Sequence, residues 1–128
     1  MNTKTAALLV GIIFLLVGIL GYFPNPIIGH SDDAIFHADS THNMVHIISG
    51  VLFLIVAMAS PASAGMFLKV FGIIYSVLGV YGLLTIGDSG TTELLGFLPV
   101  NGADNYLHIA LGILIFLLGF LPGRRVVV

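Results

Sequence analysis

Four long apolar runs constrain this chain more than any other feature of its sequence. They cover about residues 5–23, 43–60, 66–86 and 105–121 and contain a single charged residue, Lys69. At a helical rise of about 1.5 Å per residue, each run can cross a hydrocarbon layer of about 30 Å. A soluble domain of 128 residues cannot bury so much apolar surface, and the mean hydropathy of +1.12 agrees. The sequence therefore predicts an all-α membrane protein, a four-helix transmembrane bundle that forms a single domain over residues 1–128.

The residues between the runs predict where the helices begin. Asp39 stands before the second run and Asp104 before the fourth, where a carboxylate can cap a helix and favours the positive end of its dipole. Two long connections follow the first and third runs, and loops of such length are seldom structureless in a compact domain. We expect a short interfacial helix in each connection, at residues 33–38 and 92–98.

Basic and acidic residues separate onto opposite sides of the predicted bundle. The basic set consists of Lys4, Lys69, Arg124 and Arg125, and the acidic set consists of Asp32, Asp33, Asp39, Asp88, Glu93 and Asp104. Loops rich in Lys and Arg stay in the cytoplasm, so both termini are predicted to be cytoplasmic and the acidic connections external. The first run lacks a small-residue cleavage pattern after it, so we do not expect a cleaved signal peptide.

The two halves of the chain repeat. Three glycines of the first run recur in the third at an offset of 61, as Gly11, Gly18 and Gly21 and as Gly72, Gly79 and Gly82. An Asn-x-x-His motif of the second run recurs in the fourth at an offset of 62. Two spans return the chain to the side where it entered, so the copies, at about residues 5–60 and 66–121, are predicted to be parallel hairpins. The glycines are expected to let helix backbones approach closely.

The most informative polar residues are the two repeated Asn-x-x-His pairs. All five histidines lie on the predicted external side, and His46 and His108 lie inside the apolar runs. Residues three apart are neighbours on a helix, so Asn43 and Asn105 share a face with these histidines. Polar residues within a span usually face the bundle interior, so we expect the four side chains to meet between the hairpins.

Three interpretations of this cluster remain open. The first is a structural clasp, in which hydrogen bonds of the two Asn-x-x-His pairs fix the register of the hairpins. The second is a divalent metal site formed by His46 and His108, with help from His42, or from Asp39 or Asp104. The third is a bis-histidine haem, which is disfavoured because haem propionates would find no Lys or Arg on the external side. Quinone, lipid head group or proton chemistry is a further alternative.

Two segments carry a family likeness. Residues 35–46 read Ile-Phe-His-Ala-Asp-Ser-Thr-His-Asn-Met-Val-His, and residues 95–108 read Leu-Gly-Phe-Leu-Pro-Val-Asn-Gly-Ala-Asp-Asn-Tyr-Leu-His. Both resemble signatures of a bacterial family of four-span membrane proteins whose domain is of unknown function, and the resemblance covers nearly the whole chain. It implies four spans in the bacterial inner membrane and a paired Asn-x-x-His motif at the start of helices two and four. It implies no activity.

The motifs of common catalytic centres are absent from the sequence. It has no nucleophile elbow, phosphate loop or His-Glu-x-x-His motif, and no cysteine. We therefore expect a small non-enzymatic membrane protein, a structural or interaction module with an external Asn/His cluster. The alternative is a metal-binding or electron-transfer protein that uses His46 and His108. The expected partners are the lipid bilayer and a second copy of the chain or a larger membrane complex, with no nucleic acid.

Overall fold

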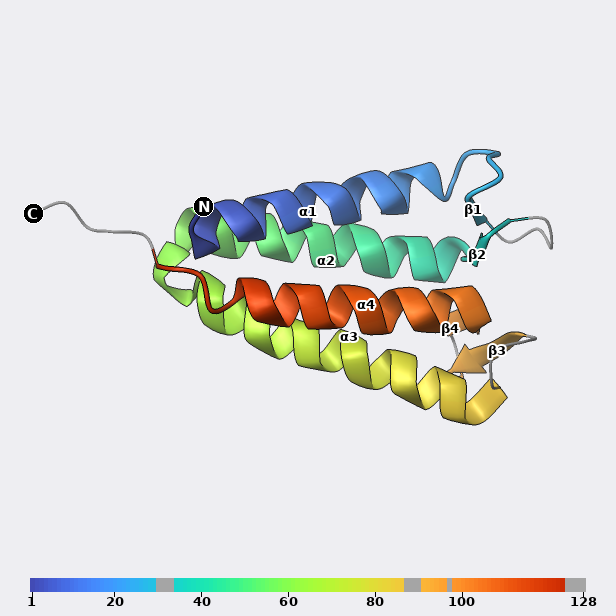
Figure 1. Ribbon diagram of the computed structural model, residues 1–128. Helices are drawn as coiled ribbons and strands as arrows, with labels where there is room; N and C mark the ends of the chain where they lie inside the picture. The colour runs from blue at the N-terminus through green and yellow to red at the C-terminus, as the bar shows by residue number, and fades with distance from the viewer. Residues whose placement is uncertain (30–33, 87–90, 97, 124–128) are drawn as a thin grey trace, which may run out of the picture.

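The part of the chain that the structure describes is mostly helical, with four α-helices and two small sheets (Figure 1). The computed structural model describes residues 1–29, 34–86, 91–96 and 98–123. The helices are α1 (Thr3–Leu20), α2 (Ser40–Ala59), α3 (Ala64–Ile86) and α4 (Gly102–Leu118), with a short 3₁₀ helix, η1 (Pro61–Ser63), between α2 and α3. The strands are β1 (Ile28–Gly29), β2 (Phe36–His37), β3 (Thr91–Leu94) and β4 (Leu98–Asn101). Five charged residues named above, Asp32, Asp33, Asp88, Arg124 and Arg125, lie outside the described residues, as does His30, one of the five histidines.

Within the described residues, three helical segments are long and apolar enough to cross a membrane. They are α1, α2 and the continuous stretch Pro61–Ile86, which joins η1 to α3. The fourth helix, α4, is apolar but has only 17 residues. The composition of the helices is therefore that of a membrane protein.

Helices α2 and α4 both begin before the apolar runs do, because side chains cap them. Asp39 is the N-cap of α2, and its Oδ1 accepts a hydrogen bond from the backbone N–H of His42 at 2.9 Å, as predicted. The prediction that Asp104 caps α4 was wrong in position, because the N-cap is Asn101. Asn101 accepts from the Asp104 backbone N–H at 2.8 Å, and the Asp104 carboxylate accepts from the Asn101 backbone N–H at 2.8 Å.

Glycines bring the helices together in two close pairs. A Cβ atom on Gly11 of α1 would lie 2.9 Å from the carbonyl oxygen of Gly50 in α2. A Cβ atom on Gly72 of α3 would lie 2.6 Å from the carbonyl oxygen of Gly112 in α4. Side chains at these crossings would push the backbones apart, so the expected role of the glycines in close helix packing is confirmed.

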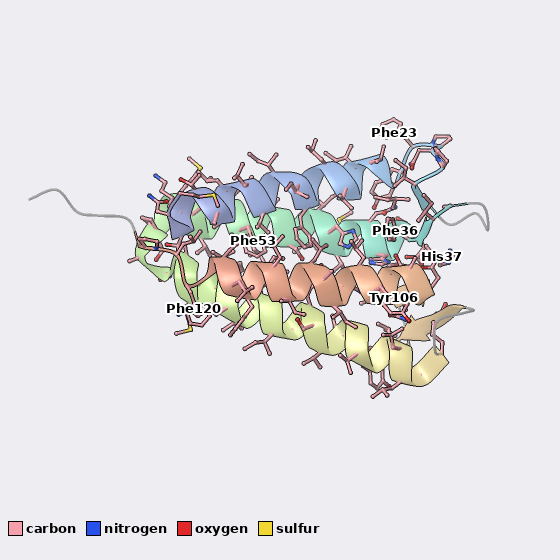
Figure 2. The ribbon with its side chains drawn as sticks, in the orientation of Figure 1. Phe23, Phe36, His37, Phe53, Tyr106 and Phe120 are labelled. Atoms are coloured by element: carbon pink, nitrogen blue, oxygen red, sulfur yellow. The ribbon has the colours of Figure 1, made fainter. Side chains whose placement is uncertain are left out.

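Aromatic side chains fill the space between the two helix pairs. Phe53 is fully buried and lies inside the bundle (Figure 2), with its ring centroid 4.6 Å from that of Phe71. Phe14 packs on the same group, with its centroid 5.3 Å from that of Tyr75 and 6.0 Å from that of Phe53. These rings connect α1, α2 and α3, and the polar cluster described below packs against them.

The connections form strands where interfacial helices were expected. In the first, β1 and β2 pair in parallel, and in the second, β3 and β4 pair antiparallel from Thr91↔Asn101 to Leu94↔Leu98. Asn25 organises the first connection: its Nδ2 donates to the carbonyl oxygen of Leu20 at 2.9 Å, and its Oδ1 accepts from Ile28 N–H at 2.8 Å. The expected helices at 33–38 and 92–98 were therefore wrong, and the fold is not purely helical.

The two ends of the described chain lie together, at the end of the bundle opposite the strands (Figure 1). The backbone N–H of Thr3 donates to the carbonyl oxygen of Pro122 at 3.0 Å. At the same end, the ammonium group of Lys69 lies 4.3 Å from the centre of the Phe120 ring, a cation–π contact. The chain thus returns to the end where it started.

Candidate functional site

Three histidines meet at the strand-bearing end of the bundle. His42 and His46 lie four residues apart on one face of α2, and His108 reaches them from α4. The ring centroid of His42 lies 4.6 Å from that of His46 and 5.8 Å from that of His108. One ring nitrogen from each side chain lies within 4.8 Å of the other two. The structure thus brings together the three histidines singled out in the sequence as metal ligands.

A hydrogen bond orients the imidazole of His42. Its Nδ1 lies 3.0 Å from the carbonyl oxygen of Pro99 in β4, which can only accept. The proton of the neutral ring therefore sits on Nδ1, and Nε2 keeps a free lone pair. Metal-binding histidines are commonly held in this way, with the second nitrogen donating to a backbone carbonyl.

His46 and His108 are buried without a hydrogen-bonding partner for one nitrogen each. They are 8% and 5% exposed, and neither Nδ1 has a partner among the described residues. The neighbouring amides are similar, because Asn43 Oδ1 and both polar atoms of Asn105 also lack partners there. All four side chains face the interior, but the hydrogen bonds of the expected clasp are not formed between them. Buried polar atoms without partners cost about 1–3 kcal/mol each, so a hydrogen-bonding or metal partner for these atoms would stabilise the cluster.

Aromatic rings hold the two deeper histidines, a feature that the sequence analysis missed. The Phe14 ring packs edge-on against His46, with centroids 5.7 Å apart, and Tyr75 packs in the same way against His108 at 5.3 Å. Phe14 and Tyr75 are separated by the same sequence offset of 61 as the glycines. Extending the repeat from glycines to aromatic residues would have found them.

The carboxylate groups near the site accept hydrogen bonds from backbone N–H groups. Asp39 caps α2, and the Oδ2 of Asp104 accepts from the backbone N–H groups of Asn101 at 2.8 Å and of His37 at 3.0 Å. Asp104 is 3% exposed, so its side chain is buried. Among the described residues, no carboxylate joins the three imidazoles as a ligand. His37 supplies its backbone to the site and not its ring.

The histidines line a cavity of about 330 Å³. One wall comes from α1, with Phe14, Val17 and Leu20, and the facing wall comes from α4, with Leu107 and Leu111. The first connection covers one end of the cavity, with Ile27, Ile28, Phe36 and Ala38. The polar lining residues are His42, His46, His108 and Asp104, and the Tyr75 ring lies beside them. Figure 2 shows Phe36 and His37 at this end of the molecule. The site is thus an apolar chamber with imidazoles at one side.

Comparison with known proteins places the chain in a family. Neither the curated proteins nor the solved structures contain a match to it. A family does match, over residues 4–121, and this range includes all three histidines of the cluster and, apart from Thr3, all residues of the four helices. The chain therefore belongs to the family described as a domain of unknown function, DUF4383.

Proposed function

We propose that the chain crosses the bacterial inner membrane four times, as two parallel copies of a helical hairpin. The fourth span is α4 with the turn after it, where Gly119 N–H donates to the Ile115 carbonyl and Leu121 N–H to the Leu118 carbonyl, both at 3.2 Å. This turn lengthens the helix toward the roughly 30 Å of a hydrocarbon layer. An even number of spans also agrees with the contact between Thr3 and Pro122, since both ends of the chain then share one side.

The matched contacts of the two hairpins support their equivalence. The Gly11–Gly50 crossing corresponds to Gly72–Gly112, and the Asp39 cap corresponds to the Asn101 cap. Large apolar side chains cover the outer faces, as expected for helices that contact lipid; they include Leu16, Ile55, Leu84 and Leu117. The proposed orientation follows the charges, with Lys4 and Lys69 on the cytoplasmic side and the histidine cluster outside.

We propose that the histidine cluster binds a divalent transition metal ion, with zinc as the first candidate. The observation that carries this proposal is the convergence of three buried imidazoles to within 4.8 Å, two of them with an unpartnered Nδ1. Three neutral imidazoles form a suitable ligand set for zinc, copper or nickel. The acidic residues at this end, among them Asp39, Glu93 and Asp104, would favour the approach of a cation.

Thermal melting with and without metal tests the site. The purified protein in detergent, treated with chelator and then given Zn²⁺ at about 100 times its Kd, should gain about 2.7 kcal/mol of stability. His46→Gln and His108→Gln should each remove this gain, because glutamine is a poor zinc ligand. His37→Gln is the matched control and should keep it, since the His37 ring is not one of the three converging ligands. A wild-type melting temperature that responds to neither chelator, zinc, copper nor nickel would refute the metal site.

A second candidate is a structural role for the same cluster, in a module that associates with itself or with a larger membrane complex. The observation that favours it is the burial of Asn43 and Asn105, at 2% and 0% exposed, against the backbones of Gly21 and Gly82. Amides in this place can fix the register of each hairpin without any ion. In that case His46→Gln should melt near the wild-type temperature, whereas His46→Leu should lose stability whether or not metal is present.

A further inference from the structure

A groove between α1 and α4 continues from the histidine cavity along the bundle. A second cavity, of about 180 Å³, lies between the same two helices and shares Ile13, Phe14 and Leu111 with the first. Its other lining residues are Met1, Ala6, Leu9, Val10, Leu114, Ile115 and Leu118, all apolar. Together the two cavities form a path with apolar walls that runs from the imidazoles toward the opposite end of the bundle.

The walls of this path are exposed to whatever surrounds the helices. Ile13 and Leu114, which line it from α1 and α4, are 53% exposed in each case. For helices in a bilayer, such exposure means contact with lipid, so a membrane-dissolved molecule can enter sideways between α1 and α4. A water-soluble ligand would instead have to cross the apolar cover formed by Ile28 and Phe36.

The charges around the histidine end of the path determine which kind of head group can bind there. The basic residues Lys4 and Lys69 lie at the opposite end of the bundle from the histidines. The acidic residues Asp39, Glu93 and Asp104 lie at the histidine end. An anionic phosphate or carboxylate head would lose its hydration and gain no cation in return. A neutral head with hydrogen-bond acceptors avoids that cost.

Histidine and aromatic side chains supply the matching recognition. The Nδ1 atoms of His46 and His108 lack partners among the described residues, so neither ring is locked in one tautomer and each can donate an N–H to a carbonyl acceptor. The rings of Phe14, Phe36 and Tyr75 line the same chamber and offer surfaces for a flat ring. A chamber of about 330 Å³ is large enough for one substituted ring, since about 150 Å³ suffices for benzene.

We infer that this path binds a membrane-soluble single-ring quinone, with its carbonyl-bearing ring in the histidine chamber and its apolar tail between α1 and α4. This inference rests on the side chains that line the path, and it does not depend on the proposed metal ion. Quinone carbonyls are neutral acceptors for the imidazole N–H groups, and an apolar tail fits the second cavity. Binding is expected in the chelated, metal-free protein.

Decylubiquinone is the probe, and tyrosine fluorescence of the metal-free protein in lipid nanodiscs is the readout. The chain has no tryptophan, so its emission comes from tyrosine, and Tyr75 lies in the chamber. Val17→Phe should block the chamber and weaken saturable quenching by about tenfold or more. Val51→Phe, the same change at a 41% exposed site on α2, should leave quenching unchanged. Equal quenching in Val17→Phe and wild type would overturn the inference.

Photolabelling of the wild-type protein gives a second test that needs no variant. An azidoquinone should label peptides from α1 and α4, and excess decylubiquinone should abolish the label. Label spread evenly over all four helices, or a co-purified phospholipid that decylubiquinone does not displace, would overturn the inference. Zinc binding is measured on separate wild-type samples without quinone, so failure of the quinone site and failure of the metal site are distinguished.

Discussion

The Nδ1 atom of His42 and the carbonyl oxygen of Pro99 lie 3.0 Å apart, although 57 residues separate them in the chain. This contact joins the first turn of α2 to strand β4. It also sets the protonation of the ring, because a carbonyl oxygen can only accept. The Nε2 atom of the neutral ring therefore keeps its lone pair.

We predict that His42 in the metal-free protein is the Nδ1–H tautomer. Nitrogen-15 NMR of histidine-labelled protein, through two-bond couplings to the ring protons, distinguishes the two tautomers. His46 and His108 lack a comparable acceptor at Nδ1 among the described residues and should exchange between tautomers. A predominant Nε2–H form of His42 would contradict the proposed orientation of the site.

Alanine at Gly21 or Gly82 should destabilise the protein by about 1–3 kcal/mol each. A Cβ atom on Gly21 would overlap the amide of Asn43, and one on Gly82 would overlap the amide of Asn105. Since both amides are buried, the helices would have to separate. Gly29→Ala is the control, because among the described residues its new Cβ would meet only the Ala34 side chain, at 3.8 Å. Denaturant or thermal unfolding in detergent measures the difference, and a stable Gly82→Ala protein would show that this contact is not tight.

Cysteine labelling tests the orientation of the bundle. An impermeant maleimide added to intact cells should label Ile35→Cys, which is 58% exposed in the first connection. It should not label Ser63→Cys, in the exposed turn between α2 and α3. The physical reason is the retention of Lys-rich ends in the cytoplasm. The reverse pattern would place the histidine cluster inside the cell.

Much of the architecture could be read from local sequence patterns. Apolar runs of about one membrane thickness placed the four helices to within a few residues, because helix length and burial in lipid depend on neighbouring residues alone. The Asn-x-x-His motifs placed Asn43 and His46, and Asn105 and His108, on shared faces for the same reason, since three residues nearly complete a helical turn. The convergence of His42 with this group also followed from its position one turn away.

The strands, the hydrogen bond of His42 and the chamber were decided only by the tertiary structure. Strand pairs such as β3 and β4 gain their stability from partners, so a short segment like residues 98–101 shows no periodicity that identifies it in advance. Pro99 and His42 meet because two hairpins pack side by side, which no local pattern encodes. The chamber between α1 and α4 arises in the same way. Its walls come from helices at opposite ends of the chain, and its volume is what remains when the side chains of both hairpins have packed.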